Sequence, residues 1–271
     1  MVLYNDPSYL VSKQYKKADN LNARIKLHEY YSTSKQNWYG FVRQLLNLQP
    51  GMHILAMGEG NGMQWRTPTG DLPDGFIAIL SDYSFGMISE AANYLREDRA
   101  FEFLCCDAQR VPFGAAQFDI VTANHMLYHV PEPKLAIAEA ARLLKPEGKF
   151  VAATNGVGHM ERLQKILSEF EPGFQQSYRY FDAFTLESGE ELLRLNFEKV
   201  ERIDYEENLW VTNAEDLADY AFSMPALQDS IRPERRPELV SYFDTLIARD
   251  GGIYIAKATG VLVGTEPKPS I

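Results

Sequence analysis

Five short apolar runs between residues 53 and 154 constrain the fold more than any other feature of the chain. They are His53–Met57, Phe76–Asp82, Phe101–Asp107, Phe118–Asn124 and Gly148–Thr154. Continuous apolar runs of this length, separated by segments of helical character, are typical of parallel strands that are buried on both faces of a sheet. We therefore predict an α/β fold, a Rossmann-like doubly wound sheet of about seven strands, whose ligand crevice lies at the carboxyl ends of the strands.

Net charge and apolar content exclude several classes of protein. The chain has 271 residues, of which 45% are hydrophobic, and a formal net charge of -10. Because a nucleic-acid surface needs clustered Lys and Arg, we expect no nucleic-acid partner. No apolar run approaches the ~18 residues of a membrane span, and residues 1–17 are polar, unlike a secretory signal. We therefore expect a cytoplasmic protein with no membrane partner, and the sequence leaves its oligomeric state open.

Cysteine and histidine spacing argues against a disulfide framework and a metal site. The only two cysteines, Cys105 and Cys106, are adjacent on a predicted strand and point to opposite faces. His125 and His129 have the i, i+4 spacing of some zinc sites, but Pro131 disfavours a regular helix there. The sequence also lacks the Gly-x-Ser-x-Gly turn of many acyl hydrolases. We therefore expect no metal and no acyl-hydrolase chemistry.

A glycine-rich turn follows the first apolar run and carries Gly58, Gly60 and Gly62. Glycine at such a turn lets the backbone approach a ligand closely, because a side chain would collide with it. Asp82 ends the second run, 22 positions after Gly60, where an acid can accept hydrogen bonds from both ribose hydroxyls. Asp107 ends the third run in the same way. The combination fits a bound adenosine.

These motifs resemble those of the class I S-adenosylmethionine-dependent methyltransferases, and specifically their small-molecule branch. The similarity runs from about residue 51 to residue 154, and its segments are Gly58–Gly62, Ser81–Ser84, Cys106–Phe113, Phe118–Val121, Asn124–His129 and Leu144–Gly148. The resemblance implies S-adenosylmethionine as cofactor and a small molecule as acceptor of a methyl group on oxygen, nitrogen or carbon. A nicotinamide dehydrogenase shares the glycine spacing and remains an alternative, but Asp107–Ala108 and Asn124–His129 favour adenosylmethionine.

The resemblance also implies roles for individual residues at the ribose and methionine ends of the cofactor. Gly58 and Gly60 would face the methionine moiety, and Asp82 would hold the ribose. The backbone of Asn124 would meet the methionine ammonium.

At the adenine end, the resemblance implies three further contacts. Tyr83 would flank the adenine ring, and Asp107, followed by Ala108, would accept a hydrogen bond from its amino group.

Two residues of the glycine loop depart from the resembling family. There the first strand ends with an acid two positions before the first glycine, where this chain has Ala56. Glu59 lies between the first two glycines, where it could repel the ligand carboxylate, turn outward or replace the missing acid. Pro68 is expected to shorten the helix that follows. The alternative hypothesis is therefore a catalytically silent or repurposed fold that binds a metabolite or partner, or that catalyses a non-methyl biosynthetic step.

Catalytic candidates lie after the fourth run and in the amino-terminal region. Methyl transfer needs a nucleophile placed in line, and a general base only where the acceptor must lose a proton. His129 and Tyr128 are expected at the crevice rim, as base or acceptor-orienting groups. His28 lies on the helical cap that closes over cofactor and acceptor in the resembling family. For each of these residues, packing alone is the competing interpretation.

We expect one structural domain made of four segments. Residues 1–50 are an N-terminal helical cap, 51–155 the nucleoside-binding α/β core, 156–252 the acceptor-side elements with a helical insertion, and 253–271 the final strand and tail. Helical patterns cover most of 20–48, 85–96, 133–144, 158–170, 188–195 and 213–249, and the last two strands are expected at 199–205 and 253–263. Pro225, Pro233 and Pro237 interrupt the helical insertion.

Overall fold

A computed structural model gives the structure of residues 18–66, 71–174 and 180–269. These residues divide into two compact units, which we describe one at a time. The sheet unit comprises the described residues within 36–157, 181–205 and 259–271, and the helical unit those within 1–35, 158–180 and 206–258. No helix in the described ranges is long and apolar enough to cross a membrane.

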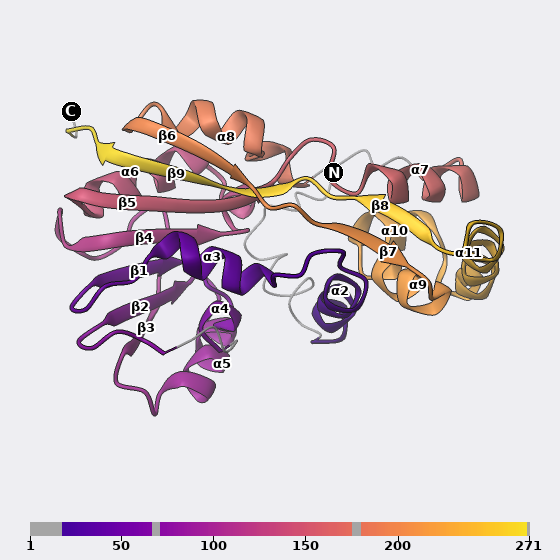
Figure 1. The fold of residues 1–271 in the computed structure, drawn as a ribbon, viewed down its shortest axis with the longest axis horizontal. Helices are drawn as coiled ribbons and strands as arrows, with labels where there is room; N and C mark the ends of the chain where they lie inside the picture. Colours follow the sequence, from indigo (N-terminus) through magenta and orange to yellow (C-terminus); the bar gives the residue numbers. More distant parts are fainter. Residues whose placement is uncertain (1–17, 67–70, 175–179, 270–271) are drawn as a thin grey trace. The chain divides into compact units, whose positions relative to one another are not determined.

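The sheet unit is built on one seven-stranded sheet with the order β3-β2-β1-β4-β5-β9-β6 (Figure 1). Its strands are β1 His53–Met57, β2 Ile77–Asp82, β3 Phe101–Cys105, β4 Phe118–Asn124, β5 Leu144–Asn155, β6 Phe197–Asp204 and β9 Thr259–Pro267. The first five strands pair in parallel, whereas β9 is antiparallel to both β5 and β6. The strand order reverses beside β1, because β2 and β3 lie on one side of it and β4 on the other. The predicted seven-stranded α/β sheet is confirmed, and ligands bind such sheets at this reversal point.

The described part of the sheet unit contains five α-helices, three of which begin at a short polar side chain that caps them. They are α3 Trp38–Leu46, α4 Met63–Arg66, α5 Phe85–Leu95, α6 Pro133–Leu143 and α8 Leu186–Leu193, with the 3-10 turns η2 Leu127–His129 and η3 Tyr180–Ala183, the latter starting in the helical unit. Asn37 accepts from the Gly40 backbone, and Ser84 from Met87 at the start of α5. Each cap satisfies an N–H that the helix leaves without a partner. Helix α4 has only four residues, and Pro68, expected to shorten it, lies outside the described residues.

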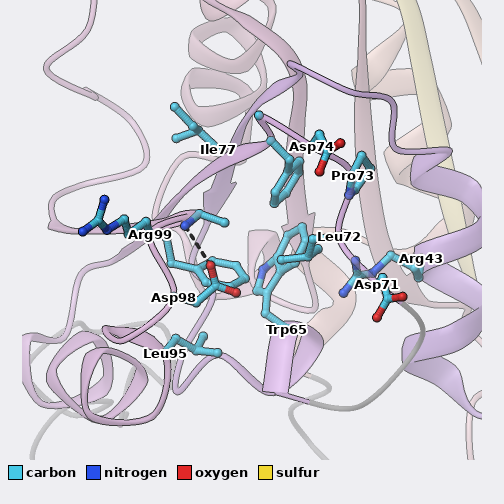
Figure 2. A pocket seen from close by; sticks show the side chains of 14 residues that line it. Arg43, Trp65, Asp71, Leu72, Pro73, Asp74, Ile77, Leu95, Asp98 and Arg99 are labelled. Atoms are coloured by element: carbon cyan, nitrogen blue, oxygen red, sulfur yellow. Dashed lines mark hydrogen bonds between the residues drawn. The ribbon is translucent and has the colours of Figure 1, made fainter.

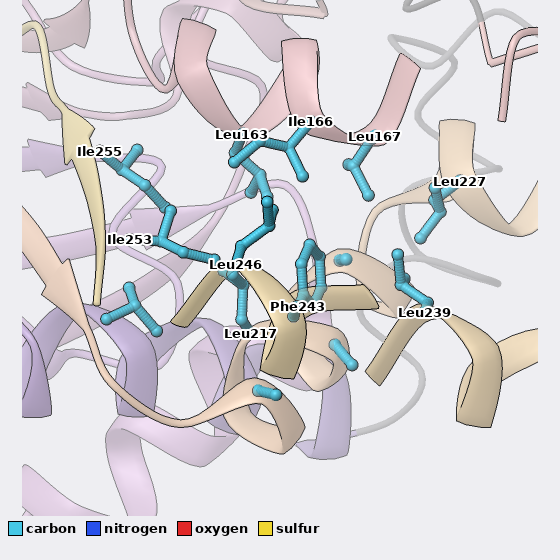
Figure 3. Packing of buried hydrophobic residues seen from close by; sticks show 14 of the residues in the cluster. Leu163, Ile166, Leu167, Leu217, Leu227, Leu239, Phe243, Leu246, Ile253 and Ile255 are labelled. Carbon is cyan, nitrogen blue, oxygen red and sulfur yellow. The ribbon is translucent and has the colours of Figure 1, made fainter. Parts of the chain in front are cut away.

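The helical unit packs five helices and a two-stranded ribbon around its own core. Its elements are α2 Ala18–Tyr30, α7 Glu161–Phe170, β7 Asn208–Val211, α9 Ala214–Phe222, α10 Pro225–Ser230, η4 Pro233–Arg235, α11 Arg236–Asp250 and β8 Ile253–Ala256. Figure 3 shows Phe243 of α11 surrounded by leucines of the same cluster. Proline occupies the first turn of α10, η4 and α11, where its missing N–H has no helical partner to lose. The interruptions expected from the prolines are therefore the starts of new elements.

Two predicted elements are each divided in the structure. The helical region 20–48 consists of α2 and α3, because Asn37 caps a new helix. The strand expected at 253–263 is also wrong as one element. Strand β8 pairs with β7, whereas β9 joins the large sheet. Lys257 lies between them and forms a buried ion pair with Glu207. The chain therefore passes from one sheet to the other at Lys257, the only charged residue of the segment 253–263.

Close packing at Gly260 generates a prediction about stability. Gly260 pairs with Asp204 across β9 and β6, and an added Cβ would lie 2.7 Å from the Ile203 carbonyl oxygen. We expect Gly260→Ala to lower the free energy of unfolding by about 1 to 3 kcal/mol, because backbone must move to admit the methyl group. Gly158→Ala is the matched control, since nothing lies within 4 Å of its added Cβ. Urea denaturation checks the pair, and equal unfolding free energies for the two variants would contradict this packing.

Candidate functional site

The carboxyl ends of β1, β2, β3 and β4 bring the predicted cofactor residues to one edge of the sheet. Strand β1 pairs with β2 and with β4, and β2 pairs with β3, so the four ends are consecutive. We call this edge the strand-end site and define it by five residues: Gly58, Gly60, Asp82, Asp107 and Asn124. All five belong to the sheet unit. Their individual roles stay predictions.

The three loop glycines adopt left-handed backbone conformations for different physical reasons. Their φ values are 59° for Gly58, 66° for Gly60 and 80° for Gly62, a region that strains other residues. A Cβ on Gly62 would lie 3.2 Å from Ala91, so this glycine lets the loop approach α5. Space beside Gly60 is open to 4 Å, whereas a Cβ on Gly58 would lie 2.7 Å from the Met126 side chain. Met126, which sequence reasoning missed, fills the space next to Gly58.

Asp82 connects the glycine loop to the start of α5. One carboxylate oxygen accepts from the Gly60 N–H at 2.9 Å, and the other from the Ser84 N–H at 2.8 Å. Burial raises the pKa of Asp82, and these two hydrogen bonds oppose that rise. A carboxylate has about four acceptor positions. Asp82 therefore fixes the loop and keeps acceptor capacity for the hydroxyls of a ribose.

The residues predicted at the adenine lie beside Asp82. The Cys106 N–H donates to the Asp82 carbonyl at 3.1 Å, which places the end of β3 next to that of β2. Gln109 donates to Asp107 from its backbone at 2.8 Å and from its side chain at 3.1 Å to each carboxylate oxygen. Ala108 is partly buried and the Tyr83 side chain is 57% exposed. Gln109, which sequence reasoning missed, holds the Asp107 carboxylate in place.

Glu59 and Ala56, the two departures from the resembling family, have different surroundings. The pKa of Glu59 is raised to about 8, chiefly by burial and also by the nearby Asp82 charge, and the Trp65 indole and the Gln64 backbone oppose that rise. The Glu59 carboxyl therefore faces Trp65 and is protonated at neutral pH. Ala56 is fully buried. Its methyl side chain cannot replace the carboxylate that the resembling family has at this position.

Part of the sheet unit is similar to a known protein family. Residues 55–152 match the model described as "Methyltransferase domain". Within its Rossmann-like sheet, the chain carries a segment that is similar to this methyltransferase domain. The predicted resemblance is thereby confirmed.

One curated relative and two solved structures are similar to the chain. Demethylmenaquinone methyltransferase of Renibacterium salmoninarum is 34% identical over 118 residues, 44% of this chain and 47% of the relative. The match thus spans about half the length of that relative. A Haemonchus contortus phosphoethanolamine N-methyltransferase 2, solved with phosphomonomethylethanolamine and S-adenosylhomocysteine, has a TM-score of 0.60 at 19% identity, covering 99% of this chain and 61% of that one. The [4+2]-cyclase SpnF has a TM-score of 0.53 at 18% identity, covering 93% and 98%. At these identities the two structures show the fold alone.

Two of the three catalytic candidates lie together in the methyltransferase domain. Tyr128 and His129 belong to η2, directly after β4, with ring centroids 4.6 Å apart. The ring centroid of His125 lies 6.4 Å from that of Tyr128 and 5.1 Å from that of Trp38. Tyr128 is only 6% exposed. An aromatic cluster therefore borders the strand-end site, and Trp38 is a member that sequence reasoning missed.

His28 belongs to the helical unit, on α2. Its ring packs edge-on against Tyr220 of α9, with centroids 5.6 Å apart. A catalytic role for His28, like those of Tyr128 and His129, stays a prediction. Among the described residues, no group of three or more His, Cys, Asp and Glu side chains is arranged to hold a metal ion.

A separate pocket of about 750 Å³ lies at the opposite edge of the same sheet (Figure 2). Its lining includes Ile77 and Phe101, the first residues of β2 and β3. Arg43 lies over the Trp65 ring at 4.9 Å, and the Nε atom of Arg43 is buried without a hydrogen bond. Because it opens at the amino ends of the strands, this pocket is distinct from the strand-end site.

The raised pKa of Glu59 predicts how stability depends on pH. An unfolded Glu loses its proton above about pH 4.5, whereas the folded Glu59 keeps it up to about pH 8. Between these values the unfolded state binds fewer protons, so stability falls as pH rises. We expect Glu59→Gln, which stays neutral, to remove about 2 to 4 kcal/mol of that loss between pH 5 and 8.

Guanidinium denaturation at each pH measures this difference. Glu102→Gln, at an exposed position of β3, is the matched control and should leave the pH profile unchanged. Parallel profiles for wild type and Glu59→Gln would show that the Glu59 carboxyl ionises normally in the folded protein.

Proposed function

We propose that this protein transfers a methyl group from S-adenosylmethionine to an oxygen, nitrogen or carbon of a small molecule. The observation that carries the proposal is the Asp82 carboxylate, fixed by Gly60 and Ser84 at the end of β2 in a methyltransferase domain. Two relatives, named demethylmenaquinone methyltransferase and ubiquinone biosynthesis O-methyltransferase, support a small-molecule acceptor. A cytoplasmic location also stays a prediction.

The residues present fit the adenosine part of this cofactor. Asp82 would bind the ribose hydroxyls, and Asp107 would accept from the adenine amino group. The exposed ring of Tyr83 would cover one face of the adenine. S-adenosylmethionine would supply a methyl group on a positively charged sulfur, and the acceptor atom would attack the carbon of that methyl group as its bond to sulfur breaks.

The protein then has little covalent chemistry to perform. Holding acceptor and donor in line supplies much of the rate. An acceptor that carries a proton must release it, and His129 beside Tyr128 would receive it or orient the acceptor. An acceptor without an ionising proton would need only the positioning that the aromatic cluster supplies.

A second candidate function is the binding or non-methyl conversion of a metabolite in the same site. Ala56 favours it, because the acid common in the resembling family is missing, and so does Met126, whose side chain lies where Gly58 would meet a ligand. The [4+2]-cyclase SpnF shares the fold, so the fold hosts chemistry other than methyl transfer. Titration calorimetry with S-adenosylmethionine and S-adenosylhomocysteine separates the candidates. Binding of both ligands supports methyl transfer, and binding of neither contradicts it.

The ribose assignment predicts the effect of removing Asp82. We expect Asp82→Ala to weaken S-adenosylhomocysteine binding by about 1.5 to 3 kcal/mol, because it deletes charge-assisted hydrogen bonds to the ribose. Ser84→Ala is the matched control, since it removes the cap of α5 but keeps the carboxylate. Calorimetry measures both variants. Equal affinities of wild type and Asp82→Ala would remove Asp82 from the binding site.

The adenine assignment predicts a change in selectivity rather than a uniform loss. Asp107→Ala should cost about 1.5 to 3 kcal/mol for S-adenosylhomocysteine, because a charged acceptor of the amino group is lost. The cost should be smaller for the inosine analogue, which carries a carbonyl oxygen in place of that amino group. Competition binding with the two ligands gives the comparison. Identical losses would mean that Asp107 does not contact the base.

A further inference from the structure

The pocket at the amino ends of β2 and β3 has an aromatic floor. The Trp65 ring packs against Phe76 and Phe101, with ring centroids 5.6 Å and 5.7 Å apart, and all three side chains are buried. Leu72 and Leu95 also line this pocket of about 750 Å³. A hollow of this volume with apolar walls can hold a small molecule. We call it the amino-end pocket.

Arg43 of α3 lies over this floor and has a donor without an acceptor. Its guanidinium carbon is 4.9 Å from the centre of the Trp65 ring, and its Nε is buried without a hydrogen bond. Burial lowers the pKa of Arg43, and no carboxylate among the described residues raises it in return. A buried donor without an acceptor costs free energy, so this one needs an explanation.

The geometry of a guanidinium defines the group that would complete it. Stacking on a ring occupies one face of the planar guanidinium, and its N–H donors point outward along its edge. Nε and a neighbouring Nη then form a fork that matches the two oxygens of a carboxylate. The partner that suits Arg43 is therefore an oxyanion in the plane of the guanidinium, attached to an apolar body that can cover the aromatic floor.

Acidic side chains at the rim restrict the charge of that oxyanion. Asp71 and Asp74 line the pocket and are exposed, and Asp98 accepts a backbone hydrogen bond at 2.9 Å. Because like charges repel, these carboxylates oppose a dianion such as a phosphate monoester more than a single carboxylate. Arg99 also belongs to the lining, but it is exposed, and Figure 2 shows its guanidinium pointing away from Trp65.

We propose that the amino-end pocket binds a small monocarboxylate with an aromatic body, whose carboxylate pairs with Arg43 and whose ring packs on the apolar lining. The strand-end site lies at the other ends of the same strands. The ligand of the amino-end pocket is therefore neither the cofactor nor the acceptor of the proposed methyl transfer, and the inference does not depend on the proposed function.

Phenylacetate is the probe, and the indole N–H signals in the nuclear magnetic resonance spectrum of the isotope-labelled protein report where it binds. The chain has three tryptophans, and Trp65→Phe identifies the signal of Trp65. We expect millimolar phenylacetate to shift that signal and to leave those of Trp38 and Trp210 in place. Phenylacetamide, the uncharged analogue, should have a Kd higher by about 10-fold or more, because it cannot form charge-assisted hydrogen bonds.

Two variants test the assignment to Arg43. Arg43→Gln should raise the Kd of phenylacetate by about 10-fold or more. Arg99→Gln is the matched control from the same lining and should change the Kd less than about 2-fold, because an exposed charge contributes little. Thermal unfolding checks that both variants fold, and the comparison of phenylacetate with phenylacetamide on wild type needs no variant.

Four results would each overturn the proposal. The first is a Trp65 signal that phenylacetate does not move. The second is equal binding of phenylacetate and phenylacetamide, which would show that the aromatic floor acts without Arg43. The third is an unchanged Kd in a folded Arg43→Gln variant. The fourth is displacement of phenylacetate by S-adenosylhomocysteine, because the probe would then occupy the strand-end site.

Discussion

The Asp82 carboxylate holds together two segments that follow different strands. Without it, the loop after β1 and the first turn of α5 after β2 would each expose a backbone N–H to a partly buried environment. Its hydrogen bonds to Gly60 and Ser84 satisfy both groups, and the Ser84 side chain caps the same helix. The charge therefore lies at the meeting point of β1, β2 and α5. The ribose contact proposed for the strand-end site depends on this geometry.

Buried parallel strands are well predicted from sequence because their apolar runs are continuous. Strands β1 and β4 have the expected bounds, and Asp82 ends β2 as expected. The strand expected at 253–263 could not be divided in advance, because its apolar residues satisfy either sheet. The division falls at Lys257, which pairs with Glu207, 50 positions away in the sequence, and such a long-range partner leaves no local signal.

The finer features of the site could not be predicted from the sequence either, because they too arise from contacts between residues far apart in the chain. The sequence marks Glu59 as unusual, but only the fold shows that burial and the nearby Asp82 charge raise the pKa of its carboxyl. The positions of Met126 over Gly58 and of Trp38 beside His125 arise from tertiary contacts. Residue type and spacing predict which strand end a side chain occupies. They do not predict what its neighbours leave unsatisfied.

The departures at the glycine loop are therefore better understood together than one by one. Ala56 removes a charge from β1, and the protonated Glu59 adds none at neutral pH, so no ionised side chain of β1 or its loop opposes a ligand carboxylate there.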